Sequence, residues 1–261
     1  MPELRDDLGH LVRVPDRVRR VVSIVPSLTE AVAVTAPGLL VGATDWCTHP
    51  PDLDVVRVRG TKNPDLARIV ALRPDLVLAN FEENREPDLA ALRAAGLAVW
   101  VTAPHTLPQA ISSLERMLTA CGCAARPAWL EAAERAWRPQ HVGERRRAFV
   151  PIWRRPWMAL GRDTFAGDVL ARLGVDHVYA DAAERYPKVT LADARARRPD
   201  LVVLPDEPYV FTPETDLRWF AGWGVPVAFV SGRHLTWYGP SLAKARKVLT
   251  RQLAAAFPAP A

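Results

Sequence analysis

The fold is decided by a stretch that occurs twice: residues 69–79 read IVALRPDLVLA and residues 194–204 read ARARRPDLVVL. In both copies a helix is expected to end at Arg-Pro, because a residue that precedes proline is driven out of helical geometry. The aspartate that follows is expected to open an apolar strand. Since Arg73 and Arg198 hold the same place in the two copies, the sequence predicts two lobes of similar construction.

Apolar strands alternate with helices around each copy, a pattern typical of an α/β sheet. The expected strands are residues 20–25, 39–43, 75–79, 97–102, 147–152, 200–204 and 226–230. Residues 107–140 show a 3.6-residue periodicity instead, and Gly122 and Pro127 divide them into two helices, the second over about 127–138. We therefore expect two Rossmann-like α/β lobes, residues 1–121 and 146–261, joined by a connecting helix within residues 122–145.

Several helix boundaries have local signals. Ser27 and Glu30 form an S-x-x-E capping box, which predicts that a helix opens there once Pro26 has ended the first strand. Asn63 and Pro64 predict an N-cap and a first helical residue. Further helices are expected from about Arg85 to Gly96, over 164–173 before Gly174, and over 240–256.

Composition indicates a globular protein and argues against nucleic acid as a partner. Hydrophobic residues make up 49% of the 261 residues and charged residues 24%, which excludes disorder and a disulfide mini-protein. The net charge is +5, but the basic residues are spread along the chain and form no run longer than Arg145–Arg147. Nucleic-acid binding requires basic residues gathered on one face.

The sequence also predicts a cytoplasmic location without membrane insertion. The first twenty residues carry nine charges and no apolar segment of the kind found in a secretory signal. No apolar stretch approaches the roughly 18 residues of a membrane span. Cysteine is scarce, at Cys47, Cys121 and Cys123, which fits a reducing compartment.

The order of motifs resembles a known family. The matching stretches are VVSIVPSLTEAV (21–32), GTKNPDLARIVALRPDLVLA (60–79), WRRPWMALGRDTFAGDVLARLG (153–174) and RYPKVTLADARARRPDLVVL (185–204). They resemble substrate-binding proteins of ABC importers whose two α/β lobes are joined by one rigid helix, a family that includes cobalamin, siderophore and haem binders. The cobalamin-binding branch is most similar. The resemblance implies a ligand cleft between the lobes.

In that branch aromatic side chains hold the flat macrocycle. The family's aromatic ligand positions fall here on Trp46, Met158 and Tyr186, and the neighbours of other such positions are Phe81, Trp153 and Trp157. Two further aromatic positions fall on Thr61 and Asn80, which are not aromatic. The expected ligand is therefore cobalamin, a similar corrinoid or another metal chelate.

The resemblance also bears on a membrane partner. Importer-coupled members carry one exposed glutamate on each lobe, which docks on arginines of the permease. Those positions fall on Ala67 and Ala192, and the nearby Asp65 and Asp193 lie at unequal offsets from the repeat. Since charge-assisted contacts fix the orientation of such an interface, we expect no coupling to a permease.

Polar residues in the expected ligand loops have two interpretations each. His49, after Cys47, is either an axial ligand to the metal of a bound chelate or an ordinary loop histidine. Glu82, with Glu83 and Asn84, lies either at the mouth of the cleft or in the polar first turn of the next helix. Arg154 follows the strand 147–152 and is a candidate contact for anionic groups. The stretch 231–242 adds Arg233, His234 and Trp237.

Two other functions stay open. An enzyme would use His234 and Arg233 with Asp206 or Glu207 as an acid/base site, although no nucleophile elbow, phosphate loop or zinc motif accompanies them. The second function is that of a conventional importer subunit, whose leader would be absent from the sequence. The interpretation we favour is a binding protein for a chelate.

Overall fold

The computed structural model describes residues 3–257. Residues 1–2 of the predicted lobe 1–121 and residues 258–261 of the predicted lobe 146–261 lie outside the described part. The chain forms two compact units. Unit 1 runs from the start of the chain to Pro104 and also contains Pro108–Ala132 and Tyr238–Pro240. Unit 2 contains His105–Leu107, Ala133–Trp237 and the chain from Ser241 onward.

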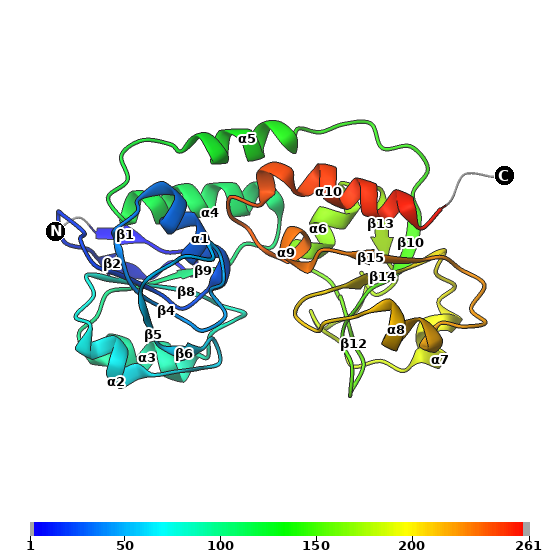
Figure 1. The fold of residues 1–261 in the computed structure, drawn as a ribbon, viewed down its shortest axis with the longest axis horizontal. Helices are drawn as coiled ribbons and strands as arrows, with labels where there is room; N and C mark the ends of the chain where they lie inside the picture. The colour runs from blue at the N-terminus through cyan, green and yellow to red at the C-terminus, as the bar shows by residue number, and fades with distance from the viewer. Residues whose placement is uncertain (1–2, 258–261) are drawn as a thin grey trace. The chain divides into compact units, whose positions relative to one another are not determined.

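Unit 1 is built on a parallel sheet of five strands in the order β5-β4-β3-β8-β9. The strands are β3 (Val21–Ser23), β4 (Leu40–Ala43), β5 (Val56–Arg57), β8 (Leu76–Asn80) and β9 (Val99–Thr102). Helices α1 (Pro26–Thr35) and α4 (Leu107–Ala120) lie on one face of the sheet, and α2 (Leu66–Ala71) and α3 (Glu86–Ala94) lie on the other (Figure 1). Two antiparallel hairpins complete the unit: β1 (Glu3–Arg5) with β2 (Leu11–Arg13), and β6 (Arg59–Gly60) with β7 (Asn63–Pro64).

Unit 2 has a parallel sheet of four strands in the order β13-β10-β14-β15. The strands are β10 (Arg146–Phe149), β13 (Val175–His177), β14 (Leu201–Pro205) and β15 (Val227–Val230). Helices α6 (Phe165–Ala171), α9 (Gly232–Thr236) and α10 (Leu242–Ala255) lie on one face, and α7 (Leu191–Ala196) and α8 (Pro213–Asp216) lie on the other (Figure 1). The hairpin β11 (Pro151–Trp153) with β12 (Met158–Ala159) follows β10, and the short 3-10 helix η1 (Leu217–Trp219) follows α8.

The two units confirm the predicted α/β class with two lobes. Within the predicted connecting segment 122–145, helix α5 spans Ala128–Ala136, and the boundary between the units falls inside it. The short strands β1, β2 and β13 were not expected from the sequence, because three residues are too few to show a periodicity. Among the described residues, no helix is both long and apolar enough to cross a bilayer.

The repeated Arg-Pro-Asp stretch makes similar contacts in both units, with two backbone N–H donors to Asp75 and one to Asp200. Arg73 and Arg198 end their helices with φ of 45° and 51°, the left-handed conformation common after a helix C-terminus. The Asp75 carboxylate accepts hydrogen bonds from the backbone N–H of Arg19 (2.7 Å) and Arg20 (2.9 Å), while the Asp75 N–H donates to the Arg20 carbonyl (2.8 Å).

Asp200 repeats this arrangement. Its carboxylate accepts from the Arg147 N–H at 2.9 Å, and its own N–H donates to the Arg147 carbonyl at 2.7 Å. We call each set of contacts an aspartate clamp. Each clamp joins the beginnings of two adjacent parallel strands, β3 with β8 and β10 with β14.

The predicted capping box is wrong. Helix α1 begins at Pro26, its N-cap is Val25, and no side chain caps it. Ser27 and Glu30 lie inside the helix and are buried. Proline is preorganised for the first helical position because its fixed φ is helical and it has no N–H to satisfy, so the helix begins one residue before the serine.

The helix start predicted at Asn63 and Pro64 is also wrong. Both residues belong to β7, and the N-cap of α2 is Asp65, whose carboxylate accepts a hydrogen bond from the Arg68 N–H at 3.0 Å. At the corresponding place in unit 2, the Thr190 hydroxyl caps α7. Asn63 and Pro64, the residues of the expected helix start, therefore form a hairpin strand, and Asp65, the next hydrogen-bond acceptor along the chain, is the helix N-cap.

The clamps predict losses of stability. Asp75→Ala should lower the free energy of unfolding by about 1–3 kcal/mol, because two backbone N–H groups lose their charged acceptor. Asp200→Ala should lower it by a smaller amount, because one N–H group loses its acceptor and Asp200 is exposed. Urea denaturation of the full chain measures this. Asp52→Ala, in an exposed turn, is the control and should change the value by less than about 0.5 kcal/mol. Losses no larger than that of the control would contradict the role of the clamps.

Candidate functional site

Three aromatic side chains stand out by their exposure. Among the described residues, the exposed large apolar side chains include only three aromatic ones: Trp46 (67%), Phe81 (53%) and Trp153 (42%). Trp46 follows β4 and Phe81 follows β8, so both lie at the carboxyl edge of the unit 1 sheet. Trp153 ends β11, directly after β10 of unit 2. Ligands of open α/β sheets bind at this edge, and all three residues were predicted as ligand contacts.

Asn80 fixes the loop that carries Phe81. The buried Asn80 side chain accepts hydrogen bonds through Oδ1 from the N–H groups of Glu82 (2.8 Å) and Glu83 (3.1 Å). Its Nδ2 donates to the Thr102 carbonyl (2.9 Å) and to the Tyr238 hydroxyl (2.5 Å). The position where the family has an aromatic residue therefore serves here to hold the loop.

The same loop excludes one of the two interpretations of Glu82, and the predicted ligand contact stays a prediction. Helix α3 begins at Glu86 with Arg85 as its N-cap, so Glu82 and Glu83 precede the helix and are not its first turn. Buried Asn84 secures the loop further, since its Nδ2 donates to the carbonyls of Thr61 (3.0 Å) and Ile24 (3.2 Å).

The loop after β4 separates a structural cysteine from a candidate ligand. Cys47 is fully buried, and its sulfur lies 3.0 Å and 3.1 Å from the hydroxyls of Thr29 and Thr44. Burial raises the pKa of the Cys47 thiol, which disfavours a thiolate. His49 is partly exposed, with Nδ1 3.2 Å from the Thr48 hydroxyl. No cluster of three metal-ligating side chains occurs within residues 3–257, and axial ligation by His49 stays a prediction.

Trp157 belongs to an aromatic cluster of unit 2. Its ring stacks on Phe211 with centroids 6.1 Å apart and an interplanar angle of 8°. The rings of Trp219 and Phe220 meet it in T-shaped geometry, with centroids 6.1 Å and 6.0 Å from the Trp157 centroid. Trp157 is therefore partly buried, as are Met158 and Tyr186.

Arg154 has a partner that the sequence did not reveal. Its Nη1 lies 2.7 Å from a carboxylate oxygen of Asp216, and the two side chains are 14% and 0% exposed. The guanidinium also lies over the ring of Tyr209, 5.3 Å from its centroid. Arg154 thus has a partner inside the unit, and its predicted contact with anionic groups of a ligand stays a prediction. No sequence signal indicates this pairing, because the two residues are far apart in the chain.

The segment after β15 joins only part of the predicted acid/base group. The Trp237 Nε1–H donates to Glu207 at 2.9 Å, and the Arg233 guanidinium lies over the Trp237 ring at 5.6 Å. His234 Nδ1 instead lies 2.9 Å from the Ser231 hydroxyl. The pKa of Glu207 is raised by burial, against the lowering effect of the Trp237 hydrogen bond.

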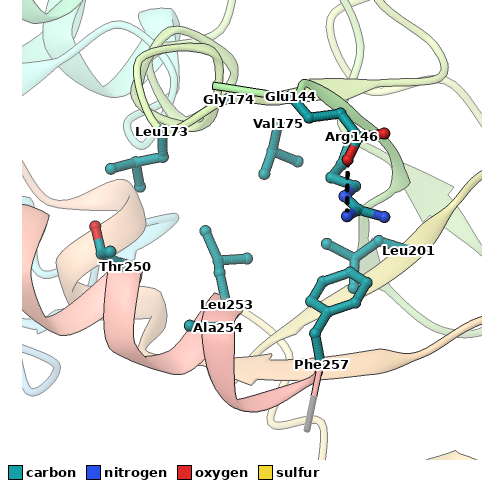
Figure 2. A pocket seen from close by; sticks show the side chains of 10 residues that line it. All are labelled: Glu144, Arg146, Leu173, Gly174, Val175, Leu201, Thr250, Leu253, Ala254 and Phe257. Atoms are coloured by element: carbon teal, nitrogen blue, oxygen red, sulfur yellow. Dashed lines mark hydrogen bonds and ion pairs between the residues drawn. The ribbon is translucent and has the colours of Figure 1, made fainter. Parts of the chain in front are cut away.

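Cavities in the described part of unit 2 include one at each end of its sheet. One of about 220 Å³ is at the amino-terminal ends of β10, β13 and β14, where Figure 2 shows apolar side chains around the space and the ion pair of Arg146 and Glu144 at its edge. None of the predicted ligand residues lines it. The other, of about 340 Å³, is at the carboxyl ends of β14 and β15, and Asp206 contributes to its lining.

The Trp237 hydrogen bond predicts a pH-dependent stability difference. Trp237→Phe should raise the pKa of Glu207 further above its unfolded value, because it removes a donor to the carboxylate. The native state then binds more protons than the unfolded chain, so stability falls as pH rises above about 4.3. The variant should be about 1–3 kcal/mol less stable than the parent at pH 7, with a smaller deficit near pH 4.

Urea denaturation between pH 4 and pH 8 measures this deficit. Trp129→Phe is the matched control, because the Trp129 indole donates to the neutral Thr35 hydroxyl at 2.9 Å and its loss should be independent of pH. A deficit for Trp237→Phe that stays constant over this range would contradict the assignment.

Comparisons with known proteins agree with this architecture. The chain is 26% identical over 255 residues to the vitamin B12-binding protein of Pectobacterium carotovorum subsp. carotovorum (strain PC1), covering 92% of this chain and 90% of that protein. No family model matches the chain.

Solved structures show the same fold. The periplasmic vitamin B12-binding protein BtuF of Vibrio cholerae has a TM-score of 0.73 at 19% identity, over 94% of this chain and 100% of that one. The periplasmic haem-binding protein BhuT in complex with two haems has a TM-score of 0.72 at 23% identity, over 91% and 98%. These findings confirm the resemblance to the family of two-lobed ABC-importer substrate-binding proteins that was inferred from the motifs.

Proposed function

We propose that the chain is a binding protein for a corrinoid such as cobalamin, or for a similar flat metal chelate, and that Trp46 and Phe81 in unit 1 and Trp153 in unit 2 are ligand contacts. The carrying observation is that these three are the exposed aromatic side chains of the described residues and follow strands at the ligand-binding edge. Flat, largely apolar macrocycles are well matched by aromatic faces and edges. Burying the apolar surface of these rings against a ligand is favourable.

The relatives support the same class of ligand. Their names include vitamin B12-binding and haem-binding proteins, and the exposed rings suit a tetrapyrrole-like chelate of this kind. His49, in the loop that carries Trp46, is the candidate axial ligand to the metal of such a chelate. Glu82 and Trp237 remain predicted contacts.

Single aromatic substitutions test the ligand site. Trp46→Ala, Phe81→Ala and Trp153→Ala should each weaken binding about tenfold, because each removes a large apolar contact worth about 1.5 kcal/mol or more. Isothermal titration with cyanocobalamin and with haemin measures the affinities. Val34→Ala, at an exposed apolar residue near the end of α1, is the control and should leave them unchanged. Binding that is insensitive to all three aromatic substitutions would contradict the site.

We also propose that the protein acts without a membrane permease, as a carrier, store or sensor. Ala67 and Ala192 are exposed in the first turns of α2 and α7, one residue after the first helical residue in each case. The two units thus present matching surfaces that carry a methyl group where the family resemblance implies a docking carboxylate. A cytoplasmic location belongs to the same proposal, and cell fractionation tests it.

The missing carboxylates predict an outcome in a reconstituted system. Proteoliposomes that contain a vitamin B12 importer should show no increase in ATPase activity when this protein is added with cyanocobalamin. The double variant Ala67→Glu/Ala192→Glu should increase it, because it restores one negative charge per unit for charge-assisted contacts. Ala71→Glu/Ala196→Glu, one turn further along each helix, is the matched control. Stimulation by the unmodified protein would contradict the proposal.

A further inference from the structure

The buried ion pair of unit 2 involves the residue that follows an exposed aromatic side chain. Arg154 is the next residue after Trp153, and its Nη1 contacts the Asp216 carboxylate at 2.7 Å. The other oxygen of Asp216 accepts hydrogen bonds from the Thr212 N–H at 3.0 Å and the Thr215 hydroxyl at 2.6 Å. Asp216 therefore joins the β11 end to the segment that enters α8, and it does so with no exposure to water.

The same guanidinium orders the neighbouring rings. Its carbon lies 5.3 Å from the Tyr209 ring centroid and 5.8 Å from that of Trp219, within the range of a cation–π contact. The Tyr209 ring in turn meets the Trp153 ring at 5.7 Å with an interplanar angle of 77°. One charged group thus fixes both the backbone that carries Trp153 and the ring that supports its indole.

An alternative role for Arg154 as an anion clamp fits these contacts poorly. A buried carboxylate already neutralises the guanidinium, and the Tyr209 and Trp219 rings cover it, so 14% of the side chain remains exposed. A ligand anion that drew the Nη1 group away would break its contact with Asp216. Taking Arg154 from Asp216 would leave a buried charge without its partner, which is strongly unfavourable.

We infer that Asp216 is a positioning residue that acts through Arg154 to hold Trp153 and Tyr209 as one aromatic surface for the ligand. The inference rests on the proposed function for the ligand and on the geometry of unit 2 for the positioning. It adds Tyr209, which the sequence did not single out, to the ligand surface.

Binding by a double-mutant cycle tests the inference. Asp216→Asn and Arg154→Met should each weaken the binding of cyanocobalamin about tenfold, and the double variant should be no weaker than either single variant, because all three lose the same support. Losses that multiply to about a hundredfold, or a loss for Arg154→Met with none for Asp216→Asn, would show that Arg154 contacts the ligand and would overturn the inference. Asp176→Asn, which breaks the exposed pair with Arg145, is the control and should not change the affinity.

A measurement without ligand separates this inference from the proposed function. In the full chain labelled with 5-fluorotryptophan, the ¹⁹F signal of Trp153 is identified by its loss in Trp153→Phe. Asp216→Asn should shift and broaden that signal and leave the Trp46 signal in place. An unchanged Trp153 signal overturns the positioning role even if the protein binds its ligand. A changed signal in a protein that binds neither cyanocobalamin nor haemin supports the positioning and contradicts the proposed function.

Discussion

The structure depends on how each unit fixes the beginnings of its central strands. In a parallel sheet neighbouring strands are not joined by a tight turn, so contacts at their ends add to the buried side-chain pattern in setting the register. The aspartate clamps supply these contacts at Asp75 and Asp200, where one residue accepts and donates backbone hydrogen bonds across two strands. Once the beginnings are aligned, the carboxyl ends of the strands fall at one edge, and the loops that follow are placed there together.

The loops at that edge are held by polar groups that are themselves buried. In unit 1 the Asn80 amide accepts from two backbone N–H groups of the loop and donates to Thr102 and Tyr238. In unit 2 the Asp216 carboxylate has three donors. Such networks are costly if any member is left unpaired, so each loop has one arrangement that satisfies them. Loops that are ordered before the ligand binds lower the entropic cost of binding.

Much of the fold followed from local sequence signals. The Arg-Pro-Asp repeat predicted two lobes because proline and aspartate act on the backbone within a few residues. The predicted helix boundaries at Ser27 and Asn63 were wrong for a related reason. Each has a neighbour, Pro26 or Asp65, that provides a better helix start, and Asn63 itself lies in the hairpin strand β7.

The positions of the candidate aromatic residues could be predicted from the sequence. Trp46 and Phe81 follow strands, Trp153 ends β11, and all three are exposed; their contact with a ligand stays a prediction. The role of Arg154 was not predictable, since it depends on Asp216, and that contact exists only in the folded chain. The same holds for Asn80, whose partners Thr102 and Tyr238 are distant in sequence.

The central claim is that the exposed aromatic side chains Trp46, Phe81 and Trp153 contact the ligand. A crystal structure of the full chain with bound cyanocobalamin tests it most directly. The account predicts that the ligand lies within van der Waals distance, about 4 Å, of Trp46, Phe81 and Trp153. A ligand bound elsewhere, for example in the cavity beside Phe257 (Figure 2), with these three rings still exposed to solvent would contradict it.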